Sequence, residues 1–341
     1  MSIVTVRIDL AKSVIAVHGV DAAGKAVLVK PRVTRDQLVP LISQLPPCLI
    51  GMEACSGAHH WARLFRQFGH TVKLMAPKLV APYRMSGKIG KNDAADAAAI
   101  CEAVTRPSMR FVPLKDEHQQ AILCLHRTRQ GFVEERTAIY NRIRGLLTEF
   151  GVVLPQSPGR LRREIGKNLD SLPNWTNRCI ADLLQHVDRI EERLAEYDRA
   201  IGEIARADTR IGQLMQLRGI GPTTASALLA SIGTGHDFKN GRQLAAWLGL
   251  TPGQYSSGGK QRLGRITKAG DAYLRSLLVL GARAVMANVG DRQDKFSRWV
   301  RNLAERRGYW RTAVAIAAKN ARLALAVLNL GEAFDHKPYA Q

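Results

Sequence analysis

The first hundred residues alternate between hydrophobic patterns typical of strands and of helices. Runs rich in β-branched residues at 3–11, 13–20 and 25–33 predict three strands, and a turn joins the last two. The next segments predict a helix, a strand, a helix and a strand, in the order 34–45, 48–53, 57–69 and 71–77. This order predicts an α/β domain in which helices pack on a mixed sheet.

The middle of the chain has apolar residues at helical spacing over long distances. The segments 116–151 and 177–208 each predict a long helix, and the polar face of the second mixes both charges, as in a coiled coil or helical hairpin. Between them, 154–175 is punctuated by Pro, Ser and Gly and is interpreted as a connector. We therefore expect a helical coiled-coil arm.

The last third is mostly helical. Gly219, Gly221 and Pro222 separate two helical stretches and predict a helix-hairpin-helix turn, whose backbone N–H groups at a helix start can hold a phosphate. An ordinary corner between two helices is the alternative. The Ala-, Leu- and Val-rich stretch from about 271 to 330 predicts packed core helices. The expected domains are 1–112, 113–210 and 211–335.

Charge separates these regions further. Fifty Lys and Arg against 29 Asp and Glu give the 341-residue chain a net charge of +21, which indicates a polyphosphate partner. Basic and acidic side chains number 15 and 7 in residues 1–110, 16 and 15 in 111–210, and 19 and 7 in 211–341. A generically basic protein would not have two basic ends around a neutral middle.

Other classes of protein are disfavoured. The N-terminus lacks the pattern of a signal peptide, and no apolar run reaches the roughly 18 residues of a membrane span. The five cysteines form no CxxC pair, which argues against a disulfide framework and a zinc site. We expect a cytoplasmic protein without a membrane partner.

Four carboxylates are candidates for a metal site. Asp9 and Glu53 end two predicted strands, and Asp93 and Asp96 lie three residues apart on one face of a predicted helix. Hard oxygen ligands of this kind suit Mg²⁺, and two such ions can clamp the attacking and leaving oxygens of a phosphoryl transfer. Alternatively, Asp93 caps its helix and Asp96 is a solvated charge.

A serine loop at 251–270 carries a candidate nucleophile. Ser257 precedes the flexible pair Gly258–Gly259, which permits close access to a nucleic-acid backbone. A serine hydroxyl needs an activating group, and the nearest histidine in sequence is His236, so the acids must meet this loop in space. Cations that can stabilise a transferring phosphate follow at Lys260, Arg262, Arg265 and Lys268. Alternatives are a plain turn, Ser256 as nucleophile, or Tyr255.

Cations and aromatics are interleaved near the C-terminus, a composition that suits nucleic-acid binding. A solvated helical face is the alternative. The residues are Arg292, Lys295, Arg298, Arg301, Arg306, Arg307 and Arg311, with Trp299, Tyr309 and Trp310.

These motifs together resemble a known family over nearly the whole chain. The segments RIDLAK, MEACSG, GKNDAADAAAI, LRGIGPTTASALLASIG and GLTPGQYSSGGKQRLGRITKAGDAYLR occur in order. They resemble the DEDD transposases of the insertion-sequence one-ten and eleven-eleven families, the bridge-RNA-guided serine recombinases. Arg7 departs from the pattern, because the family commonly has glycine two residues before the first Asp.

The resemblance implies a RuvC-like domain of the ribonuclease-H fold, in which Asp9, Glu53, Asp93 and Asp96 bind Mg²⁺. It implies a C-terminal transposase domain with Ser257 as the nucleophile. The implied partners are donor and target DNA, a structured non-coding guide RNA, and further copies of the chain in a dimer or tetramer. Two other readings stay open, namely a metal-dependent junction nuclease that uses water, and a non-catalytic nucleic-acid-binding protein.

Overall fold

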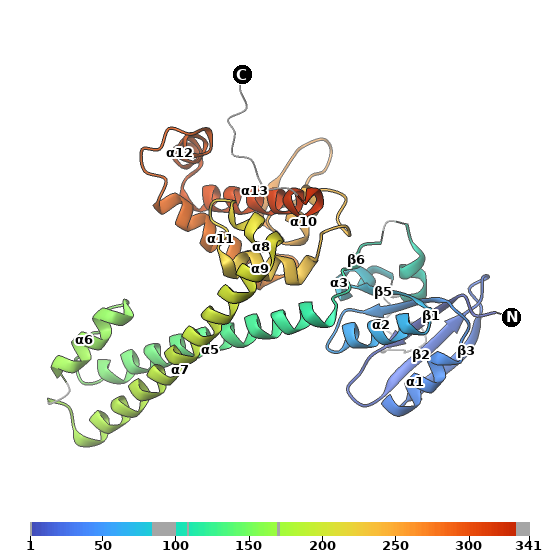
Figure 1. Cartoon of the computed structure of the whole chain (residues 1–341), viewed down its shortest axis with the longest axis horizontal. Coiled ribbons are helices and arrows are strands. Elements are labelled where there is room, and N and C mark those ends of the chain that lie inside the picture. The colour runs from blue at the N-terminus through green and yellow to red at the C-terminus, as the bar shows by residue number, and fades with distance from the viewer. Residues whose placement is uncertain (1, 84–99, 108, 169–170, 332–341) are drawn as a thin grey trace. The chain divides into compact units, whose positions relative to one another are not determined.

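The computed structural model divides into two units, Met1–Glu117 (unit 1) and His118–Gln341 (unit 2), shown in Figure 1. Unit 1 is an α/β domain, whereas the described part of unit 2 is helical apart from one small hairpin. The residues that the structure describes are 2–83, 100–107, 109–168 and 171–331.

Unit 1 contains the mixed sheet that the sequence predicts. The strand order is β3-β2-β1-β4-β5-β6, in which β1, β2 and β3 form an antiparallel meander. β4 pairs in parallel with both β1 and β5, and β6 pairs antiparallel with β5. The strands are β1 (Thr5–Asp9), β2 (Ile15–Val20), β3 (Ala26–Val33), β4 (Leu49–Glu53), β5 (Thr71–Met75) and β6 (Phe111–Val112).

Helices cover both faces of this sheet. Helices α1 (Arg35–Ser43) and α2 (Ala58–Gln67) pack on one face through a core that includes Ile8, Met52 and Phe65. On the other face, the short helix α3 (Pro77–Val80) and the helical residues 100–105 pack around Met75. The 3-10 turn η1 (Ala81–Tyr83) follows α3. Side chains alternate between the faces of a strand, so each central strand contributes to both cores.

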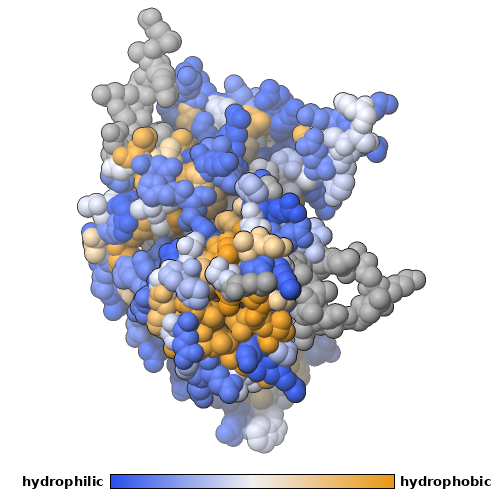
Figure 2. Space-filling view, turned by 90° about the vertical axis from the view of Figure 1, so that its right-hand side faces the viewer, coloured by the Kyte–Doolittle hydropathy of each residue, from blue (hydrophilic) through white to orange (hydrophobic). Residues whose placement is uncertain are grey.

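A few apolar side chains of unit 1 remain at the surface. Val4, Val14 and Val29 are its exposed large hydrophobic residues within the described part. Figure 2 shows apolar residues gathered on part of the visible surface, with hydrophilic residues around them.

Unit 2 begins with two long helices that run antiparallel. Helices α5 (Glu117–Thr148) and α7 (Asn174–Ala207) share a core that includes Ile143 and Ile190. Their direction follows from the ion pair of Arg129 with Asp198, at 2.6 Å, and from the contact of His186 with Glu135, at 2.8 Å. Whether this pair is a coiled-coil arm stays a prediction.

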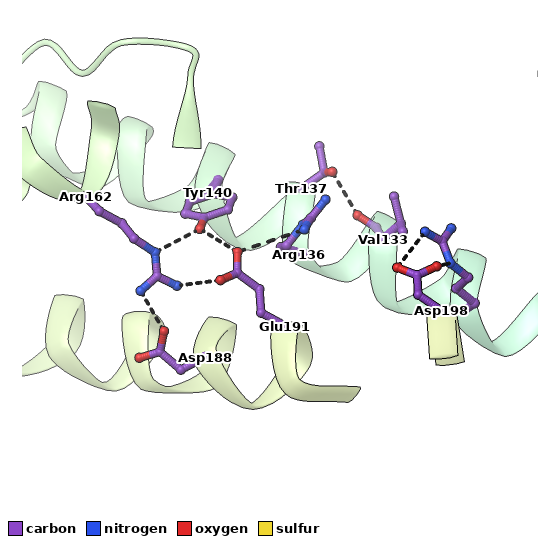
Figure 3. A network of polar contacts seen from close by, with 9 residues as sticks. Val133, Arg136, Thr137, Tyr140, Arg162, Asp188, Glu191 and Asp198 are labelled. Carbon is purple, nitrogen blue, oxygen red and sulfur yellow. Dashed lines mark hydrogen bonds and ion pairs between the residues drawn. The ribbon is translucent and has the colours of Figure 1, made fainter. Parts of the chain in front are cut away.

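The expected connector between these helices contains a further helix, α6 (Pro158–Asn168). Its Arg162 guanidinium donates hydrogen bonds to Tyr140 Oη (3.1 Å) on α5, and to Asp188 Oδ1 (2.6 Å) and Glu191 Oε2 (3.3 Å) on α7. Figure 3 shows that these side chains point toward one another. The segment joins the two long helices as the sequence indicated, but it contains a helix because its Pro and Gly begin the helix rather than prevent it.

The rest of unit 2 packs around α13 (Tyr309–Leu330), which contacts α10, α11 and α12. The expected helical stretch 271–330 begins at the capping Asp271 and is divided in three, because Asp294 caps a second helix and Gly308 adopts a positive φ before the third. The other elements are α8 (Thr209–Met215), α9 (Pro222–Ile232), α10 (Gly241–Trp247), β7 (Pro252–Gln254), β8 (Leu263–Ile266), α11 (Ala272–Ala287) and α12 (Lys295–Arg307).

Among the described residues, α13 is also the one helix whose length and hydropathy would suffice to cross a membrane. Half of its most apolar window is buried inside unit 2, and its inner face contributes Ile316 and Leu325 to the core. A core helix of a globular domain has the same composition, so this finding is weak support for a membrane span.

A buried histidine ties α5 to the C-terminal helices. His126 contacts Ser226 Oγ of α9 through Nε2 (3.0 Å) and Tyr273 Oη of α11 through Nδ1 (3.1 Å). Burial, with a smaller contribution from Arg129, lowers the pKa of His126 to about 4. The imidazole is therefore neutral at physiological pH and acts as a polar link inside the core.

Candidate active site

Asp9 and Glu53 are the last residues of two neighbouring parallel strands. β1 and β4 pair in register up to Ile8 beside Met52, so the two acids follow as the next pair. Ile8 and Met52 lie in the core under α1 and α2, so Asp9 and Glu53 project from the opposite face. Neighbouring strands lie about 4.8 Å apart, which places both carboxylates within reach of one cation.

Arg7 lies on the same face of β1, two residues before Asp9. Its guanidinium is 2% exposed and donates from Nη2 to Asp9 Oδ2 at 2.9 Å, whereas the Asp9 side chain is 46% exposed. Its backbone pairs with His18 on one side and Gly51 on the other. The result is an ion pair with a buried cation and a half-exposed anion.

The helical residues 100–105 cover this face of the sheet. Val104 packs on Gly51 so closely that a Cβ added at Gly51 would lie 3.1 Å from Val104 Cβ. Burial raises the pKa of the Cys101 thiol to about 11, although the nearby Arg7 acts to lower it. The other two predicted acids, Asp93 and Asp96, lie outside the described residues.

The thiol of Cys55 is affected by the negative charge of this site, and Cys55 was not among the site residues predicted from the sequence. Burial raises the pKa of the Cys55 thiol, and the carboxylates of Asp9 and Glu53 raise it further. Its position two residues after Glu53 was the available signal. Both carboxylates therefore act on the same small region, where two hard oxygen donors suit Mg²⁺. Within the described part of the chain, no three His, Cys, Asp or Glu residues form a metal-binding group.

The predicted serine loop is a β-hairpin. β7 and β8 pair antiparallel, and Ser257 and Lys260 form the last bridge before the turn. Lys260 N donates to Ser257 O at 3.1 Å, and the two residues between them, Gly258 and Gly259, have φ values of 55° and 75°. Positive φ at both central positions is the pattern of a type I′ turn, which glycine adopts without steric cost.

The two candidate serines differ in what their hydroxyls do. Ser256 Oγ accepts hydrogen bonds from Gln254 Nε2 (2.9 Å), on the same side of the hairpin, and from Arg262 N (3.2 Å), on the opposite side. Ser257 is exposed, and its hydroxyl makes no hydrogen bond to any residue that the structure describes. Ser256 thus stabilises the hairpin, whereas Ser257 presents an accessible hydroxyl at its tip.

Two of the predicted cations share a face of the hairpin with Ser257. Lys260 bridges to Ser257, and Arg262 O accepts from Tyr255 N at 2.9 Å, so both lie opposite residues of the Ser257 face. Arg265 is exposed on β8. Lys268 lies at the base with φ 52°, and its N–H donates to Gly249 O at 3.2 Å.

The turn between α8 and α9 contains the predicted Gly219 and Gly221. Gly219 has φ 88° and lies against α11, where a Cβ added to it would lie 2.7 Å from Gly281 O. Arg218 fixes the turn by donating to both Asp294 carboxylate oxygens at 3.0 Å. Gly221 is exposed at the start of α9 with open space around it, so it is the position that an anion can approach.

The predicted cations of α12 have different surroundings. Arg298 lines a groove of about 520 Å³ with five other side chains of the same helix face. Arg301 instead donates to the carbonyl oxygens of Gly290 (2.8 Å) and Arg292 (2.7 Å). Lys319 on α13, which the sequence analysis did not single out, lies 4.6 Å from the Trp299 ring centroid. The groove residues are Lys295, Arg298, Trp299, Asn302, Leu303 and Arg306.

Two family models match the chain. A transposase model of the DEDD type from IS110 elements matches residues 6–152, which include Asp9 and Glu53. A second model, described as the transposase IS116/IS110/IS902 family, matches residues 212–298, which include the serine hairpin.

Similar proteins extend over nearly the full chain. A probable family 20 transposase of Pseudomonas aeruginosa is 46% identical, over 96% of this chain and 98% of that protein. The transposase for insertion sequence element IS1111A of Coxiella burnetii is 38% identical, over 96% and 90%. The transposase for insertion sequence element IS1328 of Yersinia enterocolitica is 37% identical, over 98% and 99%.

Proposed function

The chain belongs to the IS116/IS110/IS902 family of transposases, and on that premise we propose that it cuts and rejoins insertion-element and target DNA with Ser257 as nucleophile. The observation that carries this proposal is the accessible Ser257 hydroxyl at the hairpin tip, beside Lys260. The neighbouring Ser256 hydroxyl, in contrast, accepts two hydrogen bonds within the hairpin. The product of the first step is a covalent phosphoserine link to DNA.

The acidic pair would hold the metal. Asp9 and Glu53 are the ligands that the described residues supply, and Asp93 and Asp96 complete the proposed DEDD set. Asp96 precedes Ile100 by four residues, and Ile100 belongs to the core on the face from which Asp9 and Glu53 project. When bound, Mg²⁺ supplies neutralisation of phosphate charge and lowers the pKa of an oxygen nucleophile.

The protein's own groups account for the bond changes. Ser257 Oγ attacks phosphorus and forms an O–P bond, while the bond from phosphorus to the leaving deoxyribose oxygen breaks. The serine proton passes to a carboxylate of the acidic set or to a water bound by it, and the leaving oxygen takes up a proton. Lys260 and Arg262 stabilise the charge on the transferring phosphate.

The reverse step rejoins strands, because a free DNA hydroxyl attacks the phosphoserine and releases Ser257. One phosphoester replaces another in each step, so no ATP is required. The mechanism requires that acids and serine act on one phosphodiester, within one chain or between two. We accordingly propose a dimer or tetramer, built from a metal-binding domain (1–112), a coiled-coil arm (113–210) and a C-terminal transposase domain with the serine (211–335).

Nucleic-acid contacts would come from three basic elements of unit 2. They are the hairpin cations Lys260, Arg262, Arg265 and Lys268, the helix-hairpin-helix-like turn at Gly219 and Gly221, and the α12 groove with Arg298. Arg301, bonded to backbone carbonyls, shapes the loop beside the groove. A structured guide RNA is proposed on the family resemblance, and the net charge of +21 is consistent with it.

One experiment tests the serine directly. The full chain, purified from cells with its co-purifying RNA, is incubated with donor and target DNA and Mg²⁺, and adducts that resist denaturation are separated on a gel. Ser257→Ala should abolish both the adduct and strand exchange. Ser256→Ala is the matched control, which removes the two hydrogen bonds that Ser256 Oγ accepts within the hairpin but keeps the nucleophile, so the adduct should persist at a reduced level.

The other outcomes separate the competing functions. Cutting without an adduct, unchanged by Ser257→Ala, would indicate a nuclease that uses water. Adduct formation by Ser257→Ala but not by Ser256→Ala would move the nucleophile to Ser256. If the wild type with its RNA never cuts, the chain only binds nucleic acid.

A further inference from the structure

A buried cation stands behind a carboxylate of the proposed metal site. Arg7 Nη2 lies 2.9 Å from Asp9 Oδ2, with the guanidinium 2% exposed and the carboxylate side chain 46% exposed. Asp9 Oδ1 makes no hydrogen bond within the described part of the chain. The guanidinium therefore holds one carboxylate oxygen from the interior and leaves the other toward the solvent.

Packing alone does not account for an arginine at this position. Burying a charge is costly, and an apolar side chain of similar volume is often at least as stable in such a place. The neighbours of Arg7 on the adjacent strands are His18 and Gly51, and neither is an acid. Arg7 forms an ion pair with Asp9, which is also the proposed ligand of a dication that a guanidinium repels.

We propose that Arg7 is a positioning residue and a built-in counter-cation of the acidic site, which weakens Mg²⁺ binding in the free protein. This inference rests on the proposed metal site. In the absence of metal, Arg7 offsets the repulsion between the neighbouring carboxylates of Asp9 and Glu53. Mg²⁺ must compete with that charge until a nucleic-acid phosphate adds a further anionic ligand.

Two opposing effects decide whether replacing Arg7 tightens or weakens Mg²⁺ binding. Loss of the guanidinium frees the Asp9 side chain, which lowers metal affinity by about threefold at most through rotamer entropy. Loss of a positive charge about 6 Å from a dication raises the affinity by about tenfold even at the dielectric constant of bulk water, about 80. The electrostatic effect is the larger, so removal of the charge should tighten Mg²⁺ binding.

The test measures Mg²⁺ binding by isothermal titration calorimetry on the full chain, without DNA. Arg7→Met and Arg7→Gln both remove the charge, and both should bind Mg²⁺ about tenfold more tightly than the wild type. Arg7→Lys keeps the charge and should stay near the wild-type affinity. Asp9→Asn combined with Arg7→Met should lose the gain, because the proposed effect acts through Asp9. Thermal unfolding of each variant establishes that it is folded. Because Arg7→Met and Arg7→Gln are both neutral, the test can still be made if one of them misfolds.

The outcomes are distinguishable from failure of the metal site. Unchanged or weaker binding by both neutral variants, with a wild type that binds, would overturn the role of Arg7 and leave the metal site intact. Equal tightening with Asp9→Asn present would also overturn it, since the charge would then act elsewhere. Absence of Mg²⁺ binding by every protein would contradict the proposed metal site itself, and this role of Arg7 with it.

Discussion

The strand ends of unit 1 and the serine hairpin of unit 2 carry the two parts of the proposed chemistry on different scaffolds. Asp9 ends a strand that is hydrogen-bonded on both sides, with cores above and below the sheet. The hairpin is a separate two-stranded sheet of three and four residues per strand, and its tip is exposed. Such a hairpin is marginally stable by itself. The acids are thus positioned before substrate arrives, whereas the serine depends on a small and adaptable element.

The largest loss of activity should come from replacing the acids at the strand ends of unit 1. Asp9→Asn and Glu53→Gln each remove one proposed metal ligand, so DNA cleavage should fall on the order of 10³-fold. The melting temperature should change little for Glu53→Gln, whereas Asp9→Asn removes the anionic partner of the buried Arg7 and should lower it. Cleavage assays and thermal unfolding check both statements. Full cleavage by either variant would leave the acids without a catalytic role and reverse the comparison.

A second prediction concerns the support beneath the hairpin. His126 is bonded to Tyr273 in the first turn of α11, and its pKa is lowered from 6.5 to about 4 by burial. The unfolded chain therefore binds a proton at higher pH than the folded chain. The free energy of unfolding should decrease as pH falls from about 6.5 to 4, by about 3 kcal/mol in total.

Urea denaturation at a series of pH values measures this loss. His126→Gln should remove most of the pH dependence in that window. His186→Gln is the control, because His186 is half-exposed on α7 and should leave the dependence intact. If both variants behave as the wild type does, another group controls acid stability and His126 is not the pH-sensitive support of α11.

A third prediction addresses the flexible side alone. Combined Gly258→Ala and Gly259→Ala would place side chains at φ 55° and 75°, each at a cost of about 1 kcal/mol. Together they cost about 2 kcal/mol, so strand transfer should fall about thirtyfold, while the melting temperature stays unchanged because the hairpin tip is outside the cores. Gly131→Ala, in the middle of α5 with open space around it, is a matched control expected to keep full activity. A large fall in melting temperature would show that the hairpin is part of the rigid core.

The smallest effect should come from the α12 groove. Arg298→Gln and Arg306→Gln should each weaken DNA or RNA binding a few-fold and reduce the slope of log affinity against log salt by about 1. Arg301→Gln loses two bonds to carbonyl oxygens and should lower the melting temperature instead. Fluorescence anisotropy at several salt concentrations distinguishes these outcomes. Equal slopes for all three variants would exclude the groove as a phosphate-binding surface.

Much of unit 1 could be predicted from the sequence because its strands alternate and its helices carry clear boundary signals. Thr34 begins the segment 34–45 that was predicted to be helical, and its N–H donates to Gln37 Oε1 at 3.1 Å at the start of α1. The adjacency of Asp9 and Glu53 followed from strand order, because parallel strands end at one edge. The bond between Arg7 and Asp9 could not be predicted, since it depends on a helix that covers the sheet face.

Unit 2 was less predictable because its decisive contacts are distant in sequence. The break between α11 and α12 depends on the capping Asp294, whose two carboxylate oxygens also bind Arg218 on a turn 76 residues earlier. The hairpin was expected only as a loop, because residues 255–262 lack the alternating apolar pattern of strands. The contrast between Ser256 and Ser257 arises from cross-strand geometry that sequence spacing does not contain.

The close approach of Gly219 and Gly281 limits how this protein can diverge. Each glycine occupies the volume that the other's side chain would need, so a substitution at either one is blocked while its partner's backbone stays in place. An amino-acid replacement at either position therefore requires that the turn and α11 move apart. A library that randomises residue 281 should return glycine almost exclusively, even though no reacting group touches it.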